Sequence, residues 1–375
     1  MAVSASVVLV CVWSAVVPVP SVSVPSSHIC IEAESGLVLD EVEADLPRPP
    51  ASMVKMMLMF LVAEGLDAGR WTLDTPVEVS ARAASIGGSQ VYLKRGEVWP
   101  LGHMMRAVSV ASANDAAMAV AEVLWGSEAA YLDHANRRAQ ELGMLDTRFN
   151  SVHGLPPDPG KEYDRTTARD MAILARWCVR EPIVLEWSRE QEIQFRPEEN
   201  VRYNTNKLLW RLAGCDGLKT GYTRAAGFCV AATAYRKGVR LIAVVMGDDN
   251  TQSRFDRAET MLETAFGEVR RTPWLAKGQP VGPAIRVQNS PLERIHVVAV
   301  EDVSVTVRER DRDRLRLVIQ CPERFRAPLL SGATVGEGLV QLDGYTLARV
   351  PLAVPQDIPS AGWRWKLERT ALPRD

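Results

Sequence analysis

Apolar residues recur with two different periods along the chain, and the change of period divides it into segments. In the stretch 27–45, apolar and polar positions alternate, which predicts two short strands around a Glu-Ser-Gly turn. The segment 49–65 is apolar almost throughout, so it predicts a buried helix that begins near Pro50 and ends near Gly65. Residues 66–100 keep no period and are expected to be irregular, with short strands.

A helical period dominates the middle of the chain. The segment 127–143 is amphipathic, with Ser127 as the expected N-cap and Gly143 as the expected C-cap. Apolar runs on either side of Arg-Lys-Gly, residues 236–238, predict a β-hairpin. Strands, a long helical insert, then strands and a helix predict an α/β fold with a helical second lobe. The further helices are expected over 100–112, 114–126, 166–180 and 254–269.

The pattern changes again after about residue 275. Short alternating strands and polar turns follow one another, and no helical period is present. This pattern predicts a small all-β domain over 280–375. The segment 272–283 contains Pro and Gly and is expected to be the linker between the two domains.

Composition adds limits to this picture. The chain has 375 residues, which suggests two or three domains. The formal net charge is -2, so nothing indicates a nucleic acid as a partner. The six cysteines form no CxxC pair and the five histidines are scattered, so the sequence predicts no metal site and no cofactor.

The N-terminus carries an apolar run, residues 6–20, of the length found in signal peptides. It is too short and too rich in proline to span a bilayer comfortably. A basic segment should precede such a run, but residues 1–6 carry no Lys or Arg. A misplaced start or an N-terminal strand is the alternative, and we favour a truncated signal peptide over 1–20. This interpretation predicts an exported, extracytoplasmic protein at the cell wall or the membrane surface.

The buried helix predicted over 49–65 contains an unexpected charge. Lys55 is the only ionisable side chain from Ala51 to Ala63, and burying an unpaired ammonium costs on the order of several kcal/mol. Ser52 lies three residues earlier, on the same helical face. A desolvated lysine loses its proton more readily, so Lys55 could act as a base for the Ser52 hydroxyl. The alternative is that Lys55 extends to solvent and Ser52 only caps the helix.

Two further short motifs follow. The stretch "ASANDAA" holds Ser112 and Asn114 between two predicted helices, where a capping turn is the simpler explanation. The stretch "DGLKTGYT" holds Lys219, Thr220 and Gly221 before the predicted hairpin, where a strand edge and a turn are the simpler explanation. Each motif alone is weak evidence. The order SxxK, SxN, KTG is far more specific.

Together the three motifs resemble the signature of penicillin-binding proteins and serine β-lactamases. More of the chain is similar to one branch, the D-alanyl-D-alanine carboxypeptidases or low-molecular-mass penicillin-binding proteins. The resemblance covers roughly residues 25–360. It implies a β-lactamase/transpeptidase-like catalytic domain over 21–273, with an antiparallel sheet flanked by helices, followed by the all-β domain. The similar stretches are "PPASMVKMM", "GGSQVYLKRGE", "VASANDAAMAVAE", "NSVHGLP", "NTNKLLWRLAGCDGLKTGYT" and "RLIAVVMGDDN".

The resemblance also implies a role for each catalytic residue. Ser52 is the acylated nucleophile and Lys55 is its base. Ser112 passes a proton toward the leaving group, and Asn114 holds the substrate amide. The oxyanion hole is formed by the backbone N–H groups of Ser52 and Tyr222.

The remaining residues of the motifs are expected to bind substrate. Lys219 and Thr220 face the terminal carboxylate of the substrate, and Gly221 permits a close approach of backbone on an edge strand. Arg254, at the start of the last predicted helix, matches a position that helps to hold this carboxylate. A surface arginine is the alternative for Arg254.

The implied function is a serine-type D-Ala-D-Ala carboxypeptidase. It removes the terminal D-alanine from peptidoglycan stem peptides, and β-lactam antibiotics are its covalent inhibitors. The sequence departs from the pattern at two points. Some members have His where this chain has Tyr222. Membrane-bound members end in an amphipathic helix, for which too few residues follow the β domain, so membrane association is possible but no anchor helix is seen. Trp363 and Trp365 are expected to pack on the β domain.

Two other functions stay open at this point. A class A β-lactamase is the nearest alternative, but nothing between Asn114 and Lys219 matches its E-x-x-L-N loop. Such enzymes also lack a second β domain. A non-catalytic protein that binds muropeptides in the cell wall is the other alternative.

Overall fold

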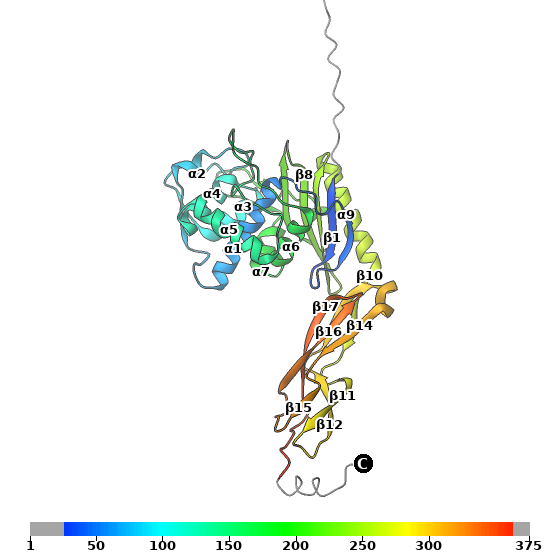
Figure 1. Cartoon of the computed structure of the whole chain (residues 1–375). Helices are drawn as coiled ribbons and strands as arrows, with labels where there is room; N and C mark the ends of the chain where they lie inside the picture. The colour runs from blue at the N-terminus through cyan, green and yellow to red at the C-terminus, as the bar shows by residue number, and fades with distance from the viewer. Residues whose placement is uncertain (1–25, 363–375) are drawn as a thin grey trace, which may run out of the picture.

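The first domain is built around a five-stranded antiparallel sheet. The computed structural model describes residues 26–362, and Figure 1 shows this sheet between a helical lobe and a single long helix. Its strand order is β2-β1-β9-β8-β7, so β7 lies at an edge. The α/β architecture expected from the sequence is therefore confirmed. The strands are β1 (Ser27–Glu32), β2 (Val38–Val42), β7 (Cys215–Thr223), β8 (Gly227–Arg236) and β9 (Val239–Asp248).

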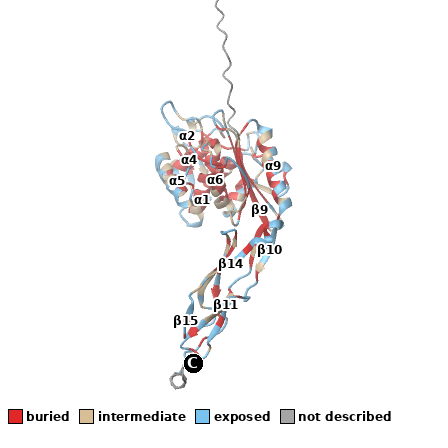
Figure 2. Cartoon of the chain, turned by 45° about the vertical axis from the view of Figure 1, so that its right-hand side comes forward, coloured by how far each residue is buried: buried red, intermediate tan, exposed pale blue. Residues whose placement is uncertain are grey.

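Both faces of the sheet are covered. Helix α9 (Thr251–Glu268) packs on one face, and α6 (Ala168–Cys178) and α7 (Pro182–Arg189) pack on the other. In β9, alternate residues therefore enter two different cores: Leu241 and Val245 face α9, whereas Ile242 faces the helical lobe. A strand that is buried on both faces reads as a continuous apolar run, as the sequence of β9 does. Figure 2 shows buried residues along β9 and in the helices beside it, such as α6.

The predicted hairpin is confirmed, with a two-residue turn. Arg236 pairs with Val239, and Lys237 and Gly238 between them have φ angles of 49° and 81°. Positive φ at both central residues is the geometry that matches the twist of a tight hairpin.

The predicted long helices are also present. Ser127 accepts a hydrogen bond from the backbone N–H of Ala130, and Gly143 has φ 87°, so the expected caps of α5 are correct. Three short helices were not predicted, because one or two turns carry too little period to be recognised. The other elements of the lobe are η1 (Ala51–Val54), α1 (Lys55–Asp67), β3 (Pro76–Glu78), α2 (Ala81–Ser85), β4 (Val98–Pro100), α3 (Leu101–Val110), α4 (Asn114–Trp125), α5 (Glu128–Leu142), β5 (Glu192–Ile193), β6 (Arg202–Tyr203) and α8 (Leu208–Arg211).

The second domain consists of strands, as predicted. It contains a six-stranded sheet, in the order β14-β16-β17-β12-β11-β15, and the pair β10-β13. One 3-10 turn, η2 (Glu309–Arg314), was not predicted. The strands are β10 (Val269–Leu275), β11 (Pro280–Gln288), β12 (Arg294–Ala299), β13 (Val303–Arg308), β14 (Leu315–Gln320), β15 (Arg324–Arg326), β16 (Thr334–Leu342) and β17 (Tyr345–Ala353).

The expected linker over 272–283 is wrong. Most of this segment lies in β10 and β11, and β10 follows α9 directly. Pro273 does not prevent strand formation because β10 belongs to a two-stranded ladder whose register shifts between Pro273 and Leu275. Proline is tolerated at such edges and bulges. Only the short turn over 276–279 separates the two strands.

The β1–β2 turn contacts the second domain (Figure 1). Tyr345 Oη donates to the backbone oxygen of Ser35 over 2.9 Å, and Arg271 forms an ion pair with Glu34. Leu37 packs against apolar clusters of both domains.

Two expectations fall on residues outside the described range of 26–362: the signal peptide over 1–20 and the packing of Trp363 and Trp365. Within that range, none of the helices is long and apolar enough to cross a membrane.

Candidate active site

Ser52 and Lys55 meet at the junction of η1 and α1. Ser52 lies in the 3-10 turn, and Lys55 is the first residue of the α-helix. Lys55 is fully buried, and its Nζ lies 2.9 Å from Ser52 Oγ. Lys55 Nζ also donates to Asn114 Oδ1 over 2.7 Å and to the backbone oxygen of His153 over 2.9 Å. The alternative that Lys55 extends to solvent is therefore wrong.

The surroundings of Lys55 favour the neutral amine. Burial is the main reason why the pKa of Lys55 lies well below its ordinary value, and the nearby charge of Lys219 lowers this pKa further. Asp164 and Asp115 act in the opposite direction. They do not outweigh the loss of solvation.

Ser112 connects the helical lobe to the sheet. Its Oγ accepts a hydrogen bond of 2.9 Å from Lys219 Nζ. Ser112 occupies the turn between α3 and α4 with φ 57°, in the left-handed region that few serines adopt. Lys219 is 1% exposed, and burial, with the charge of Arg254, lowers its pKa to about 7.

The motif Lys219-Thr220-Gly221 lies on the edge strand β7, as expected. Thr220 Oγ1 donates to Thr205 Oγ1 over 2.7 Å. A Cβ atom on Gly221 would lie 2.5 Å from the backbone oxygen of Pro50. The close approach that requires this glycine is therefore that of the backbone before Ser52. The neighbouring side chain, Tyr222, is 55% exposed and packs on Phe228.

Arg254 is not a surface residue. It is 7% exposed and donates from Nη1 to the backbone oxygens of Gly221 (3.0 Å) and Cys229 (3.1 Å). Its guanidinium also lies 4.6 Å from the ring centroid of Phe255. It therefore supports the KTG strand, and its Nε is buried with no hydrogen-bond partner among the residues that the structure describes.

Several contributors to the site were missed by sequence reasoning. The carbonyl group of His153 contacts both Ser52 and Lys55, although the resemblance gave "NSVHGLP" no role. The neighbouring Gly154 has φ 80°, and its Cβ would lie 2.1 Å from the backbone oxygen of Ala51. The only sequence signal for this contact was a His-Gly pair. Backbone acceptors of this kind leave no trace in side-chain patterns.

The loop between α2 and β4 also contributes. Asn114 Nδ2 donates to the backbone oxygen of Gly87 over 2.8 Å. The backbone N–H of Asn114 donates to the backbone oxygen of Ser89 over 2.7 Å. Within residues 26–362, no group of three or more His, Cys, Asp or Glu side chains is placed to hold a metal ion.

A family model described as D-alanyl-D-alanine carboxypeptidase matches residues 17–250. The chain belongs to this carboxypeptidase family. A second model, described as the C-terminal domain of penicillin-binding protein 5, matches residues 271–360. This carboxypeptidase is a serine hydrolase with an additional β-rich domain.

Relatives cover nearly the whole carboxypeptidase. DacF, a D-alanyl-D-alanine carboxypeptidase of Bacillus subtilis, is 32% identical over 348 residues, which are 92% of this chain and 88% of DacF. DacA of Escherichia coli K12, with the same printed activity, is 31% identical over 350 residues, 91% of this chain and 85% of DacA. These names favour neither the β-lactamase nor the non-catalytic alternative.

Solved structures agree. Penicillin-binding protein 5 from Haemophilus influenzae has a TM-score of 0.75 at 27% identity. The match covers 89% of this chain and 97% of the chain of that protein. Penicillin-binding protein D2 from Listeria monocytogenes, solved in its ampicillin-bound form, is 31% identical with a TM-score of 0.58 and covers 64% of this chain and 96% of its own.

Proposed function

We propose that this carboxypeptidase removes the terminal D-alanine from peptidoglycan stem peptides through an acyl-enzyme on Ser52. The observation that carries the proposal is the fully buried Lys55, whose Nζ lies 2.9 Å from Ser52 Oγ. A serine hydroxyl becomes an effective nucleophile when an adjacent base takes its proton.

The neighbours of Lys55 support its role as the base. A neutral amine has two N–H groups and one lone pair. Asn114 Oδ1 and the backbone oxygen of His153 can only accept hydrogen bonds, so they take the two N–H groups. The lone pair of Lys55 then points to its third neighbour, the Ser52 hydroxyl. In this arrangement the proton of Ser52 passes to Lys55 as Oγ attacks the peptide carbonyl carbon.

Breakdown of the tetrahedral intermediate needs a proton for the leaving amine. Ser112 Oγ accepts from Lys219, so its own hydroxyl hydrogen is free to be donated. We assign to Ser112 the relay of a proton to the nitrogen of the departing D-alanine: its hydroxyl gives a proton to the nitrogen and regains the one that Lys55 took from Ser52, so that the protons balance. The backbone N–H groups of Ser52 and Tyr222 are assigned to the oxyanion, and Asn114 to the substrate amide.

The terminal carboxylate of the substrate is assigned to Lys219 and Thr220. Lys219 is a buried cation beside Ser112, and Thr220 supplies a hydroxyl on the same edge strand. Gly221 lets this strand lie against the backbone before Ser52. Arg254 supports the strand from behind, through the carbonyl group of Gly221, and adds positive charge.

We further propose that the enzyme acts outside the cytoplasm after export, with residues 1–20 as its signal peptide. Peptidoglycan is an extracytoplasmic substrate, and the named relatives are enzymes of the same activity. β-Lactams are expected to acylate Ser52 because a protein of similar structure, penicillin-binding protein D2, was solved in its ampicillin-bound form.

Mass spectrometry after incubation with benzylpenicillin tests the proposal. We expect one adduct, mapped to the peptide that contains Ser52, and loss of both the adduct and D-alanine release in Ser52→Ala. Ser85→Ala, at an exposed serine of α2, is the matched control and should keep both. An adduct that persists in Ser52→Ala would show that the nucleophile is wrongly assigned.

A further inference from the structure

We propose that Arg196 is a positioning residue for the catalytic base. It holds the loop over residues 87–93, which fixes the side-chain amide of Asn114, and this amide orients Lys55. The inference rests on the proposed role of Lys55 and assigns a function to a residue outside the three motifs.

The first link is the orientation of the Asn114 amide. Its Nδ2 donates to the backbone oxygen of Gly87, and its Oδ1 accepts from Lys55. If the amide were reversed, Oδ1 would face the carbonyl oxygen of Gly87 and the NH₂ group would face Lys55. An oxygen cannot donate to an oxygen, so the carbonyl group of Gly87 determines that Oδ1 faces the base. Lys55 then keeps its lone pair for Ser52.

The second link is the loop that carries Gly87. Residues 86–97 contain no helix or strand, so their conformation depends on contacts with other segments. From the inside, the carboxylate of Asp115 accepts hydrogen bonds from the backbone N–H groups of Val91 and Leu93, at 3.2 Å and 3.0 Å. Asp115 is buried and adjoins Asn114, so it ties the loop to the start of α4.

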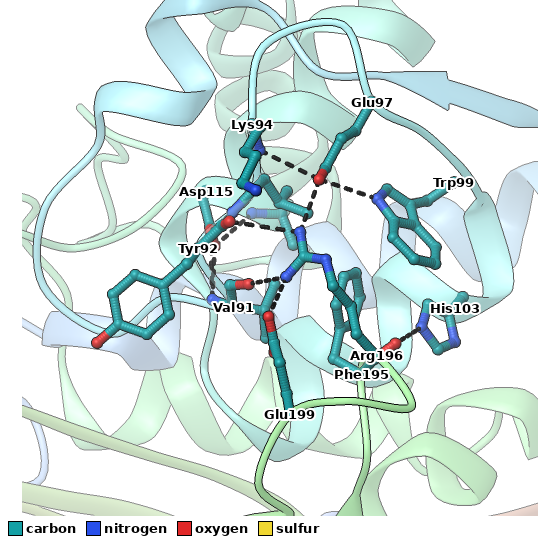
Figure 3. A network of polar contacts seen from close by, with 12 residues as sticks. Val91, Tyr92, Lys94, Glu97, Trp99, His103, Asp115, Phe195, Arg196 and Glu199 are labelled. Atoms are coloured by element: carbon teal, nitrogen blue, oxygen red, sulfur yellow. Dashed lines mark hydrogen bonds and ion pairs between the residues drawn. The ribbon is translucent and has the colours of Figure 1, made fainter.

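Arg196 supplies the outer contact. Its Nη1 donates to the backbone oxygen of Val91 over 2.8 Å, and its Nη2 lies 3.3 Å from that of Tyr92. The peptide groups of Val91 are therefore held on both sides, by Asp115 and by Arg196. Figure 3 shows the guanidinium group between this stretch of loop and Glu97, with Glu199 below.

Arg196 is itself held firmly. Its side chain is 10% exposed and forms ion pairs with Glu97 (2.7 Å) and Glu199 (2.5 Å). The guanidinium also lies 5.5 Å and 5.2 Å from the ring centroids of Trp99 and Phe195. A planar cation fixed by two carboxylates and two rings is a rigid support. Arg196 joins two loops that are about a hundred residues apart in sequence.

Loss of this support should change the chemistry of Lys55 as well as the stability of the lobe. A loosened loop admits water beside Asn114 and Lys55. Burial is the largest cause of the lowered pKa of Lys55, so hydration moves this pKa back toward its ordinary value. The pH at which acylation begins should therefore rise. The acylation step itself should slow, because the amine is no longer oriented.

The test measures acylation by benzylpenicillin across pH in full-length Arg196→Met, with the rate constant of acylation separated from the affinity of initial binding. We expect that rate constant to fall about tenfold or more, and the acid limb of its pH profile to move to higher pH. Arg196→Lys can restore one carbonyl contact and should recover part of the rate.

Arg138→Met is the matched control. Arg138 is likewise an arginine of the helical lobe with two ion pairs, to Glu64 and Glu141, and its side chain is half-buried. None of the contacts of Arg138 involves the loop over residues 87–93, so the pH profile of acylation in Arg138→Met should stay that of the wild type. Should Arg196→Met not fold, the double variant Glu97→Gln/Glu199→Gln weakens the support with little change of shape and should move the limb in the same direction.

Two results would overturn the inference. The first is an unchanged rate constant of acylation and an unchanged acid limb in folded Arg196→Met or in the double variant. The second is an equal loss of the acylation rate constant in Arg138→Met. Either result leaves wild-type acylation of Ser52 intact. A failure of the proposed function is different, because the wild type would then form no adduct at Ser52.

Discussion

At the scale of single residues, the site depends on keeping one amine out of water. Lys55 is surrounded by carbonyl-type acceptors and by the Ser52 hydroxyl, and no carboxylate among the described residues 26–362 forms an ion pair with it. A carboxylate partner would raise the pKa of Lys55 and hold its proton. The surroundings of Lys55 therefore suit a base better than a structural cation.

Replacement of Lys55 by arginine separates these two roles. A guanidinium keeps the charge but does not lose its proton near neutral pH. We expect folded Lys55→Arg to acylate with benzylpenicillin about 10²-fold more slowly or worse, the usual contribution of a positioned base. Circular dichroism would check the fold. Near-normal acylation by the folded variant would restore the structural interpretation.

The pKa of Lys219 predicts a second pH effect. In its proposed role Lys219 binds a carboxylate only while it is protonated, and burial lowers the pKa of Lys219 in the free enzyme to about 7. Because kcat/KM reports the free enzyme, its value for a peptide ending in D-Ala-D-Ala should fall as the pH rises through about 7. The C-terminal amide of the same peptide lacks the charge that Lys219 binds. The amide should be a poor substrate at every pH, and its kcat/KM should not show the fall above about pH 7.

The comparison of the two peptides contains its own control. As the proposed base, Lys55 must be neutral for either peptide to react. The increase of kcat/KM from acid pH upward should therefore be the same for both peptides. Identical profiles and equal rates for acid and amide would mean that the carboxylate pocket is misassigned.

At the scale of elements, the position of Ser52 depends on how closely β7 approaches η1. Gly221 allows the contact with the backbone of Pro50, since a Cβ there would lie 2.5 Å from its oxygen. Gly221→Ala should displace the strand from the turn, at a cost of about 1–3 kcal/mol in stability. It should also slow acylation, because Lys219 and Ser52 move apart.

Gly267→Ala is a suitable comparison for that variant. Gly267 lies in α9, and its Cβ would meet no atom within 4 Å. There alanine should raise the free energy of unfolding by about 0.4–1 kcal/mol, with no change in acylation. Thermal unfolding and the rate of penicillin acylation measure both effects. A Gly221→Ala enzyme with wild-type stability and rate would contradict the proposed role of the contact.

The elements also show how far sequence reasoning reaches. Long segments with a steady period, such as α5 and the β8–β9 hairpin, were predicted together with their caps and turn. The linker over 272–283 was wrong, because Pro and Gly mark a bulged edge strand as well as a connection. In the candidate site, side-chain motifs predicted Ser52 and Lys219. They could not identify the carbonyl groups of His153 and Gly87, since every residue has one.

At the scale of the whole molecule, the position of the domain boundary decides how the catalytic domain can be isolated. A chain that ends after residue 279 keeps β10 without its partner β13 and exposes an unpaired strand. A chain that ends after Glu268 stops with α9. We expect the shorter form to keep penicillin acylation and the longer one to aggregate more readily.

Both truncated forms should be less stable than the full chain. They lose the hydrogen bond from Tyr345 to Ser35 and the second-domain packing of Leu37. Size-exclusion chromatography, thermal unfolding and acylation of the three forms test these expectations. A shorter form that does not fold would show that the second domain is required for the first.

The edge position of β7 has a consequence for the selectivity of the enzyme. Within residues 26–362, no strand pairs with the outer edge of β7. Backbone groups on such an edge can pair with an extended peptide laid alongside, as in strand addition. Main-chain pairing of this kind does not depend on the side chains of the bound peptide. The enzyme should therefore be strict about the last two residues of its substrate and indifferent to chemical variety further upstream.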